Sequence, residues 1–234
     1  MHLLAFETAT RRVSVALWRD GEVLERFADM PNNGSEVLLP WAQALLAEAG
    51  ITLSQIDAIA FGAGPGGFTG LRLACGVTQG LAFGLDRPVV PVSTLAALAL
   101  SAGDGVVWTL LDARMNEVYG ALYRVAGESV TELSAPICAP PQQLAVPSAP
   151  TFALNEFIGA GDGFAAYADA LQNVASGLAT IRPELMPSAA AVARLAAPLA
   201  LRGEVVSAAE AQPIYVRDKV AFTTAERLAR GGVR

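Results

Sequence analysis

The chain has 234 residues, of which 53% are hydrophobic and only 16% are charged, and 16 basic against 22 acidic side chains give a net charge of −6. This composition excludes an intrinsically disordered chain, because disorder goes with few apolar residues and many charges. The acidic balance disfavours an independent nucleic-acid-binding module, and two cysteines are too few for a disulfide scaffold and indicate a reducing compartment.

The high apolar content raises the question of a membrane-spanning segment. The longest run without a charged residue, residues 133–155, contains five prolines, which are incompatible with a spanning helix. The first residues, Met1 to Glu7, have neither the basic start nor the cleavage site of a signal peptide. We therefore expect a cytoplasmic protein with no membrane contact. Because few charged residues remain to cover its outside, we also expect a surface that a partner buries.

The first hundred residues predict an α/β layer with a mixed sheet. Short apolar segments indicate strands, and Asp20-Gly21 is a hairpin turn signal. Longer apolar segments that end at glycine indicate helices. The predicted order is strands at 3–6, 13–18 and 23–28, a helix at 35–49, a strand at 58–63, a helix at 69–84, a strand at 89–92 and a helix at 94–102.

The pattern then begins again. A predicted strand at 106–111 ends at Asp112, as the first strand ends at Glu7, and an aromatic-Arg pair and a Gly-Glu turn follow both in the same order. Any two β-hairpins share some of these features, but the common order favours an internal duplication. It predicts two lobes, residues 1–103 and 104–217, with a helix at about 218–231 that returns to the first lobe.

The predicted helices at 35–49 and 69–84 are apolar on nearly all sides. Gly76, Gly80 and Gly84 recur every four residues and so leave one face almost without side chains, at a cost of up to about 1 kcal/mol per glycine. A helix that flanks a sheet should keep one wet face. We therefore favour a docking face for another protein, although shielding by the rest of the chain is the alternative. The expected interface residues are Leu38, Leu39, Ala42, Leu45, Leu46, Leu71, Arg72, Cys75, Gly76, Gln79, Gly80 and Phe83.

The sequence predicts no catalytic or metal-ligating set. Its single histidine is His2, and Cys75 and Cys138 are far apart and lack the spacing of paired ligands. Cys75 lies in an apolar helix and is best read as a small buried hydrophobe. The glycine-rich residues 64–72 resemble a phosphate cradle but lack the Lys-Ser/Thr of a P-loop, and a tight strand-to-helix turn is the simpler interpretation.

Two carboxylates stand where a duplicated fold would place them across a cleft. Glu7 and Asp112 each end a first strand at a turn, and such carboxylates can hold Mg²⁺ through water around a nucleotide. A role in forming the turns is an equally good interpretation. The residues of this low-specificity nucleotide site are Glu7, Thr8, Thr10, Asp112, Gly161 and Asp162.

Four segments, in this order along the whole chain, resemble the TsaB (YeaZ) family. They are Phe6-Glu7-Thr8-Ala9-Thr10, residues 64–72, Asp112-Ala113-Arg114-Met115-Asn116-Glu117-Val118-Tyr119 and Pro213-Ile214-Tyr215-Val216-Arg217. The resemblance implies a two-lobed, duplicated α/β fold of the actin, Hsp70 and sugar-kinase (RNase H-like) class, with mixed sheets flanked by helices. It also implies a role in making N6-threonylcarbamoyladenosine in tRNA, beside the anticodon.

In that family the transferase is a related protein, TsaD, of the Kae/Gcp type, and TsaB is its non-catalytic paralogue without the metal-binding histidines. The resemblance implies a scaffold that pairs through helices 35–49 and 69–84 with a TsaD-like subunit or a second copy of itself. A TsaE-like ATPase joins them, and tRNA is contacted only indirectly. No cofactor is required by this chain, although ATP and Mg²⁺ at a vestigial or junction site are left open.

Two departures from the family pattern weaken the nucleotide or metal site. Glu7 stands where the family often has Asp, and Asn33-Gly34-Ser35 stands where many members have His-Ser or His-Thr. Two other functions are alternatives. One is a nucleotide-binding ATPase or phosphotransferase of the actin-like class, and the other, disfavoured by the lack of ligands, is a metallo-glycoprotease.

Overall fold

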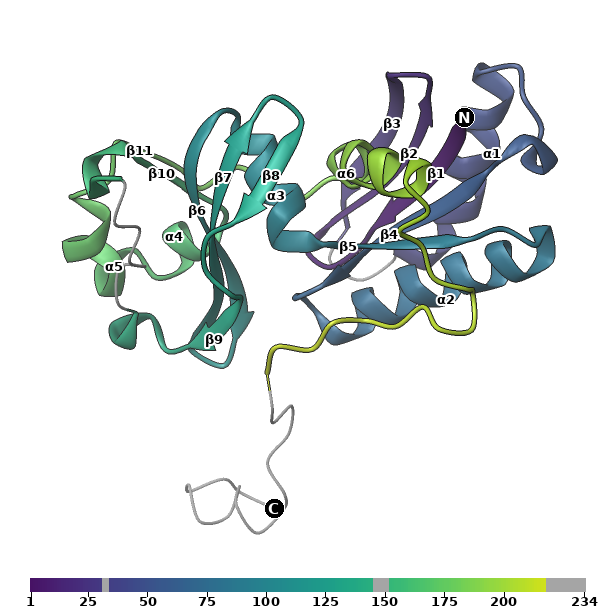
Figure 1. The fold of residues 1–234 in the computed structure, drawn as a ribbon. Coiled ribbons are helices and arrows are strands. Elements are labelled where there is room, and N and C mark those ends of the chain that lie inside the picture. The colour runs from purple at the N-terminus through teal and green to yellow at the C-terminus, as the bar shows by residue number, and fades with distance from the viewer. Residues whose placement is uncertain (31–33, 145–151, 218–234) are drawn as a thin grey trace, which may run out of the picture.

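The computed structural model describes residues 1–30, 34–144 and 152–217, and two α/β lobes lie side by side in it (Figure 1). The first sheet has the strands β1 (His2–Glu7), β2 (Arg12–Arg19), β3 (Glu22–Asp29), β4 (Ala58–Gly64) and β5 (Val89–Ser93), in the spatial order β3-β2-β1-β4-β5. The first three strands are antiparallel, whereas β4 pairs in parallel with both β1 and β5. The sheet is therefore mixed, as the sequence predicts.

The second sheet repeats this arrangement. Its strands are β6 (Gly105–Arg114), β7 (Glu117–Ala126), β8 (Ser129–Glu132), β10 (Phe157–Ala160) and β11 (Thr180–Arg182), in the order β11-β10-β6-β7-β8, and β9 (Ile137–Ala139) pairs with β7. Strands β6, β7 and β8 are antiparallel, and β10 pairs in parallel with β6 and β11. The duplicated α/β fold is confirmed, and Glu7 and Asp112 occupy matching places on the first strand of each sheet.

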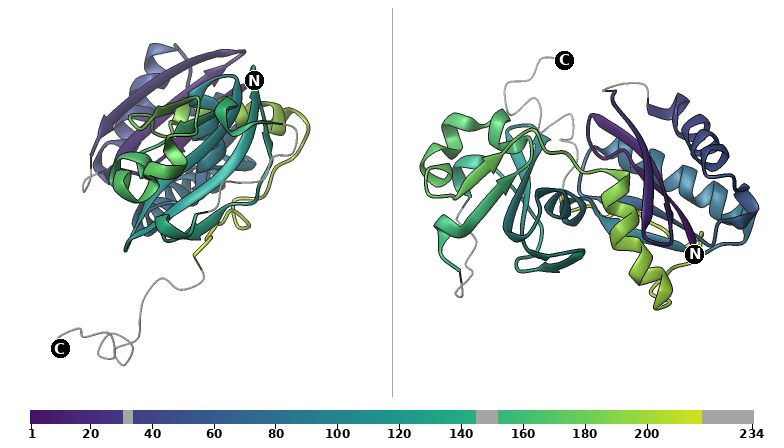
Figure 2. Two further views of the ribbon diagram at one scale, coloured as in Figure 1. Left: turned by 90° about the vertical axis from the view of Figure 1, so that its left-hand side faces the viewer. Right: turned by 90° about the horizontal axis from the view of Figure 1, so that it is seen from above.

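Helices cover both faces of the first sheet (Figure 2). Leu4 and Phe6 of β1 join one core cluster with α1 (Leu38–Glu48) and α2 (Phe68–Leu85), whereas Leu3 and Ala5 join another with α6 (Ala189–Leu201). This division follows the alternation of side chains along a strand. The α6 side is lined largely by alanines, which let the helix approach closely.

Helix α3 (Thr94–Ala102) lies between the two sheets, and α4 (Gly163–Ala166) and α5 (Ala168–Ala175) belong to the second lobe (Figure 1). Short 3₁₀ turns stand at Gly34–Glu36, Leu53–Gln55, Pro141–Gln143 and Leu154–Glu156. Within the described residues, no helix combines the length and the apolarity that are needed to cross a bilayer.

The predicted second lobe, residues 104–217, differs from the observed one at its end. Helix α6 packs on the first sheet, where Ser14 Oγ accepts a hydrogen bond from the Ala189 N–H at 2.8 Å and Glu25 accepts one from the Ala190 N–H at 2.9 Å. The chain then stays with the first lobe, because Val206 pairs with Val89. An apolar helix carries no signal of the sheet on which it packs, and so the sequence could not place it. The predicted helix at 218–231 lies outside the described residues.

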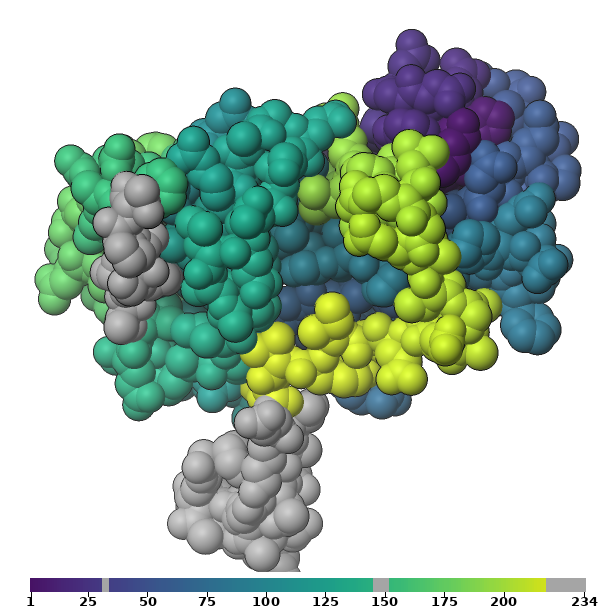
Figure 3. Space-filling model, in the orientation of Figure 1, coloured from purple at the N-terminus to yellow at the C-terminus, as the bar shows by residue number. Residues whose placement is uncertain are grey.

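Residues 211–217 form an extended strap along the lower edge of the first lobe that ends against the second (Figure 3). The Ile214 N–H donates to the Ala63 carbonyl at 2.7 Å, and Gln79 Nε2 donates to the Ala211 carbonyl at 3.0 Å. At the other end, Arg217 donates to the Ala113 carbonyl at 3.0 Å. The strap therefore ties the two lobes together.

Candidate functional site

One side of α2 is exposed along the whole helix. The exposed positions are three or four residues apart, so they share one face, which we call the α2 stripe: Thr69, Arg72, Gly76, Gly80, Phe83 and Gly84. The opposite side packs on the first sheet through Leu71, Ala74, Cys75, Thr78 and Ala82. Phe83, at the end of the stripe, is 80% exposed.

The three glycines of the stripe have no function within the chain. A Cβ added to Gly76, Gly80 or Gly84 would meet no atom within 4 Å, so no close approach in this structure requires glycine at these positions. Each glycine nevertheless costs helix stability, about 1 kcal/mol relative to alanine. A smooth strip that ends in an exposed phenylalanine is typical of a face that another protein covers.

Half of the residues predicted for the interface are instead buried in the chain's own core, which corrects that part of the prediction. They pack against the sheet from α1 and α2 and are at most 6% exposed. A helix that is apolar all round gives no signal of which side faces inward, and this is why the sequence could not separate the two groups. The buried residues are Leu38, Ala42, Leu45, Leu46, Leu71 and Cys75.

The remaining interface residues are accessible to different degrees. Leu39 of α1 is 47% exposed, and Arg72, Gly76, Gly80 and Phe83 belong to the α2 stripe. Gln79 is half-buried, because its side chain holds the strap. These residues stay a predicted pairing surface.

The glycine-rich segment before α2 is shaped by the β1–β2 turn. The Gly67 N–H donates to the Ala9 carbonyl at 2.7 Å, and Thr8 Oγ donates to the Gly70 carbonyl at 2.6 Å. A Cβ on Gly70 would lie 1.9 Å from the Thr8 carbonyl oxygen. Glycine is therefore needed here for backbone to approach backbone, and the interpretation as a tight turn accounts for it without a phosphate.

Glu7 does not face a cleft, which corrects its predicted place in a nucleotide site. Its side chain is fully buried, with Oε1 accepting the Ala9 N–H at 2.7 Å and Oε2 accepting the Thr94 hydroxyl at 3.2 Å. The carboxylate fills the space beside Gly62, where a Cβ would lie 1.9 Å from Oε2. Burial raises the pKa of Glu7 to about 7, against the smaller opposing effect of these hydrogen bonds.

The second-lobe carboxylates lie close together, and their oxygen atoms bond to groups of the lobe itself. Asp112 accepts the Arg114 N–H at 2.8 Å and the Tyr167 hydroxyl at 2.9 Å, and pairs with the Arg114 guanidinium at 3.0 Å. Asp162 accepts the Asp112 N–H at 3.0 Å, and burial raises its pKa. Next to it, Gly161 has φ of 108° and lies against the Leu110 carbonyl, so only glycine fits.

The other two nucleotide candidates also serve the local structure. Thr8 is buried with its hydroxyl on Gly70, and Thr10 Oγ accepts the Arg12 N–H at 3.2 Å. Among the described residues, no group of three or more His, Cys, Asp or Glu side chains is placed to hold a metal ion. The structure therefore brings Asp112 and Asp162 together and separates Glu7 from them.

The strap adds further residues to this surface. Their only signal in the sequence is that they belong to the segment Pro213–Arg217, which resembles the family. The Arg72 guanidinium stacks 3.9 Å from the centroid of the Phe68 ring and donates to the Tyr215 hydroxyl at 3.3 Å. The Phe68 and Tyr215 rings are 5.7 Å apart. Arg217 forms an ion pair with Glu117 of the second lobe. The start of α2, the strap and the β6–β7 turn thus form one continuous surface.

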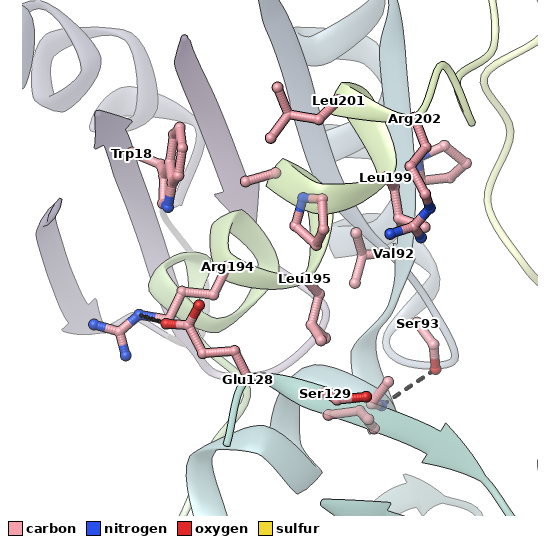
Figure 4. A pocket seen from close by; sticks show the side chains of 15 residues that line it. Trp18, Val92, Ser93, Glu128, Ser129, Arg194, Leu195, Leu199, Leu201 and Arg202 are labelled. Atoms are coloured by element: carbon pink, nitrogen blue, oxygen red, sulfur yellow. Dashed lines mark hydrogen bonds and ion pairs between the residues drawn. The ribbon is translucent and has the colours of Figure 1, made fainter. Parts of the chain in front are cut away.

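A groove of about 620 Å³ separates the lobes on the α6 side (Figure 4). Leu195, Leu199 and Leu201 of the α6 helix line it from one side, and the β7–β8 turn lines it from the other. Arg194 lies 3.7 Å from Glu128 across the groove. None of the residues predicted for the interface or for the nucleotide site lines it.

Comparison with known proteins relates the whole chain to one family. A family model described as "TsaD: tRNA N6-adenosine threonylcarbamoyltransferase" matches residues 30–225. The chain is 36% identical to the tRNA threonylcarbamoyladenosine biosynthesis protein TsaB of Escherichia coli, over 95% of this chain and 97% of that protein. It is 35% identical to the TsaB protein of Haemophilus influenzae, over 94% of this chain and 95% of the relative.

A solved structure agrees with these matches. YeaZ from Pseudomonas aeruginosa superposes with a TM-score of 0.82 and 39% sequence identity, over 92% of this chain and 99% of that one. The similarity therefore extends over nearly the full length in sequence and in fold. Together with the duplicated α/β architecture, these matches establish that the chain belongs to the TsaB (YeaZ) family.

Proposed function

We propose that this chain is a non-catalytic subunit of the machinery that transfers a threonylcarbamoyl group from threonylcarbamoyl-AMP to N6 of the adenosine beside the tRNA anticodon. It acts in the cytoplasm with a TsaD-like transferase and a TsaE-like ATPase. The relatives named as tRNA threonylcarbamoyladenosine biosynthesis proteins support the pathway. The net charge of −6 supports a subunit that leaves most of the contact with tRNA to its partners.

The observation that carries the proposal is the α2 stripe. Its glycines allow a partner helix to approach the backbone closely, and Phe83 offers a large apolar side chain to bury. Leu39 of α1 adds apolar area at 47% exposure. The TsaD-like subunit binds here, and in its absence a second copy of this chain covers the same surface.

The proposal of a non-catalytic role draws support from the candidate chemical groups. Glu7 is buried, and the Asp112 carboxylate is already bonded to Arg114 and Tyr167. A carboxylate that ligates Mg²⁺ needs free oxygen atoms that face the ion. The chain acts by holding its partner in an active form, and supplies no group to the transfer step.

The direct test is reconstitution of tRNA modification with the purified TsaD-like and TsaE-like proteins of the same organism. We expect threonylcarbamoyl transfer to require this chain, and variants with Asp112→Asn to support it as well as the wild type. Transfer at the full rate without the chain would contradict the scaffold role. Loss of transfer in a folded Asp112→Asn variant that still binds its partner would favour a catalytic role.

A nucleotide-dependent ATPase or phosphotransferase is the second candidate, because Asp112 and Asp162 lie together near the ends of their strands. Calorimetry of the isolated chain with ATP and Mg²⁺, read for the heat of ATP hydrolysis as well as for binding, separates the two functions. The scaffold role predicts no hydrolysis by this chain alone. Turnover that Asp162→Asn abolishes, in a protein that remains folded, would establish the alternative.

A further inference from the structure

A cavity of about 170 Å³ lies between the lobes at the beginning of α2. The glycine-rich segment, the β6–β7 turn and the strap each contribute a wall, and the lining is predominantly apolar, including Leu71, Tyr119 and Val216. Its volume is well below the roughly 300–1,000 Å³ of pockets that hold drug-sized ligands. It therefore fits a single side chain better than a whole small molecule.

The rim of this cavity gathers exposed apolar side chains. The described residues contain ten large hydrophobic side chains that are exposed, and four of them line this one cavity. Their exposed fractions lie between 41% and 54%: Phe68, Met115, Ile214 and Tyr215. Single exposed apolar residues are ordinary, but a group around a cavity marks an interaction surface.

The turn that carries Met115 has an unfavourable backbone. Arg114, Met115 and Asn116 have φ of 60°, 57° and 59°, which non-glycine residues rarely adopt, and here three follow one another. This conformation holds Met115 exposed at the edge of the cavity, and Arg217 of the strap donates to the Arg114 carbonyl at 3.3 Å. The exposed methionine is thus positioned by its own turn and by the strap.

Arg72 supplies a charge at the same edge. Its guanidinium contacts the Tyr215 hydroxyl and the Phe68 ring, but among the described residues no carboxylate lies within ion-pair distance of it. By contrast, Arg114 is paired with Asp112, and Arg217 with Glu117. A cation without a carboxylate partner, on a chain of net charge −6, complements an acidic group on another molecule.

We propose that this cavity receives one apolar side chain of the protein that pairs on the α2 stripe, and that a carboxylate of the same segment binds Arg72. The inference rests on the proposed pairing function and extends its surface onto the second lobe. Arg72 belongs both to the α2 stripe and to the edge of the cavity, so the two surfaces are continuous. A partner that binds here contacts both lobes and fixes their relative position.

The test measures the affinity of the full chain for the TsaD-like protein of the same organism, by calorimetry. Met115→Glu places a charge at the apolar rim and is expected to weaken binding about tenfold or more. Arg72→Glu is expected to weaken it by a similar factor at low ionic strength and by less at high ionic strength, because salt screens the charge pair. Leu201→Glu, an exposed residue of the α6 helix, is the matched control and should change the affinity less than about twofold.

A further variant separates this inference from the pairing function on which it rests. Phe83→Glu alters the α2 stripe at a residue that does not line the cavity. If Phe83→Glu abolishes binding while Met115→Glu and Arg72→Glu bind like the wild type, the cavity proposal is wrong and the pairing function stands. If the wild-type chain does not bind the TsaD-like protein at all, the pairing function itself fails.

Two remaining outcomes are also decisive. If Met115→Glu lowers the melting temperature, the experiment is repeated with Met115→Ser, which introduces no charge. Unchanged affinity of that folded variant would overturn the proposal. If Met115→Glu and Arg72→Glu leave pairing unchanged but abolish binding of ATP to the isolated chain, the cavity belongs to a nucleotide site and the proposal is likewise overturned.

Discussion

Helices α2 and α6 cover opposite faces of the same sheet, and both are rich in apolar residues, yet their outer sides differ. On the outside of the α6 helix, Arg194 lies 3.7 Å from Glu128, and Arg202 at its end pairs with Glu204. On the outside of α2, the stripe presents three glycines and Phe83 besides Thr69 and Arg72, and among the described residues none of its side chains forms an ion pair. The small residues of α6 face the sheet, whereas those of the α2 stripe face outward.

This difference explains where the surplus of apolar residues goes. Alanines in α6, such as Ala193 and Ala196, are fully buried and stabilise the chain itself by close packing. A Cβ added to Gly76 or Gly80 would meet no atom within 4 Å, so packing does not require these glycines, and their effect on the chain's own stability is unfavourable. The two helices are alike in composition, and only the direction of their small residues separates the helix that packs on its own chain from the helix that we propose to pair.

The largest expected effect on stability comes from Glu7, whose hydrogen bonds support the turn before α2. Glu7 holds the Ala9 N–H, and Ala9 in turn accepts the Gly67 N–H before α2. Its pKa of about 7 in the folded state exceeds the ordinary value of 4.5 for a glutamate, so the folded state keeps the proton longer, and stability falls as the pH rises through this window. The difference corresponds to about 3 kcal/mol above pH ~7.

Urea unfolding of the wild type and Glu7→Gln at about pH 5 and about pH 8 measures this effect. We expect the wild type to lose stability between these pH values and Glu7→Gln to lose distinctly less. On the other face of the sheet, the Ser14 hydroxyl that accepts the Ala189 N–H of α6 does not titrate. Ser14→Ala should therefore keep the pH dependence of the wild type. An identical pH dependence for Glu7→Gln and the wild type would show that Glu7 does not titrate in this range.

Ser14→Ala tests the α6 side of the comparison. Ser14 and Ala189 are both fully buried, and the substitution leaves the Ala189 N–H without its acceptor. We expect a loss of about 1–3 kcal/mol in the free energy of unfolding, the usual cost of an unsatisfied buried donor. Pairing with the TsaD-like protein should be unchanged below the melting temperature. A loss of pairing without a loss of stability would place part of the pairing surface on α6.

The smallest effects come from exchanging small residues on the two helices. Gly76→Ala should raise the free energy of unfolding by up to about 1 kcal/mol, because the new methyl group meets no atom and helix propensity improves. Ala196→Gly, the reverse change in the α6 helix, should lower it by at least about 1 kcal/mol. Thermal unfolding checks both signs. A destabilised Gly76→Ala would mean that the glycine is needed within the chain after all.

Much of the fold could be predicted from the sequence, because local patterns determine it. The helix expected at 69–84 is α2, Phe68–Leu85, and the repeated order of strand, turn and strand correctly predicts two sheets of equal topology. The placement of α6 could not be predicted. Its contacts, such as the one from Ser14 to Ala189, join residues that are 175 positions apart.

The candidate site is less predictable from the sequence, for physical reasons that differ between its parts. The sequence pattern predicts that Leu45 and Leu46 face a partner, but they pack on the sheet, because an evenly apolar helix lacks a polar side that would orient it. Glu7 was expected in a cleft, but the space beside Gly62 accommodates its carboxylate in the interior. The cavity between α2 and the strap depends on three segments that only the folded chain brings together.

The central claim is that the α2 stripe, and not the equally apolar α6 helix, pairs with the TsaD-like subunit. Two variants test this claim, each with one arginine added to an exposed position: Gly80→Arg on α2 and Pro198→Arg on α6. Each is mixed with the TsaD-like protein and analysed by sedimentation velocity. We expect that Gly80→Arg stays folded and sediments apart from its partner, while Pro198→Arg forms the complex like the wild type. If Gly80→Arg forms the complex with wild-type affinity, or if only a folded Pro198→Arg fails to form it, the α2 stripe is not the pairing surface.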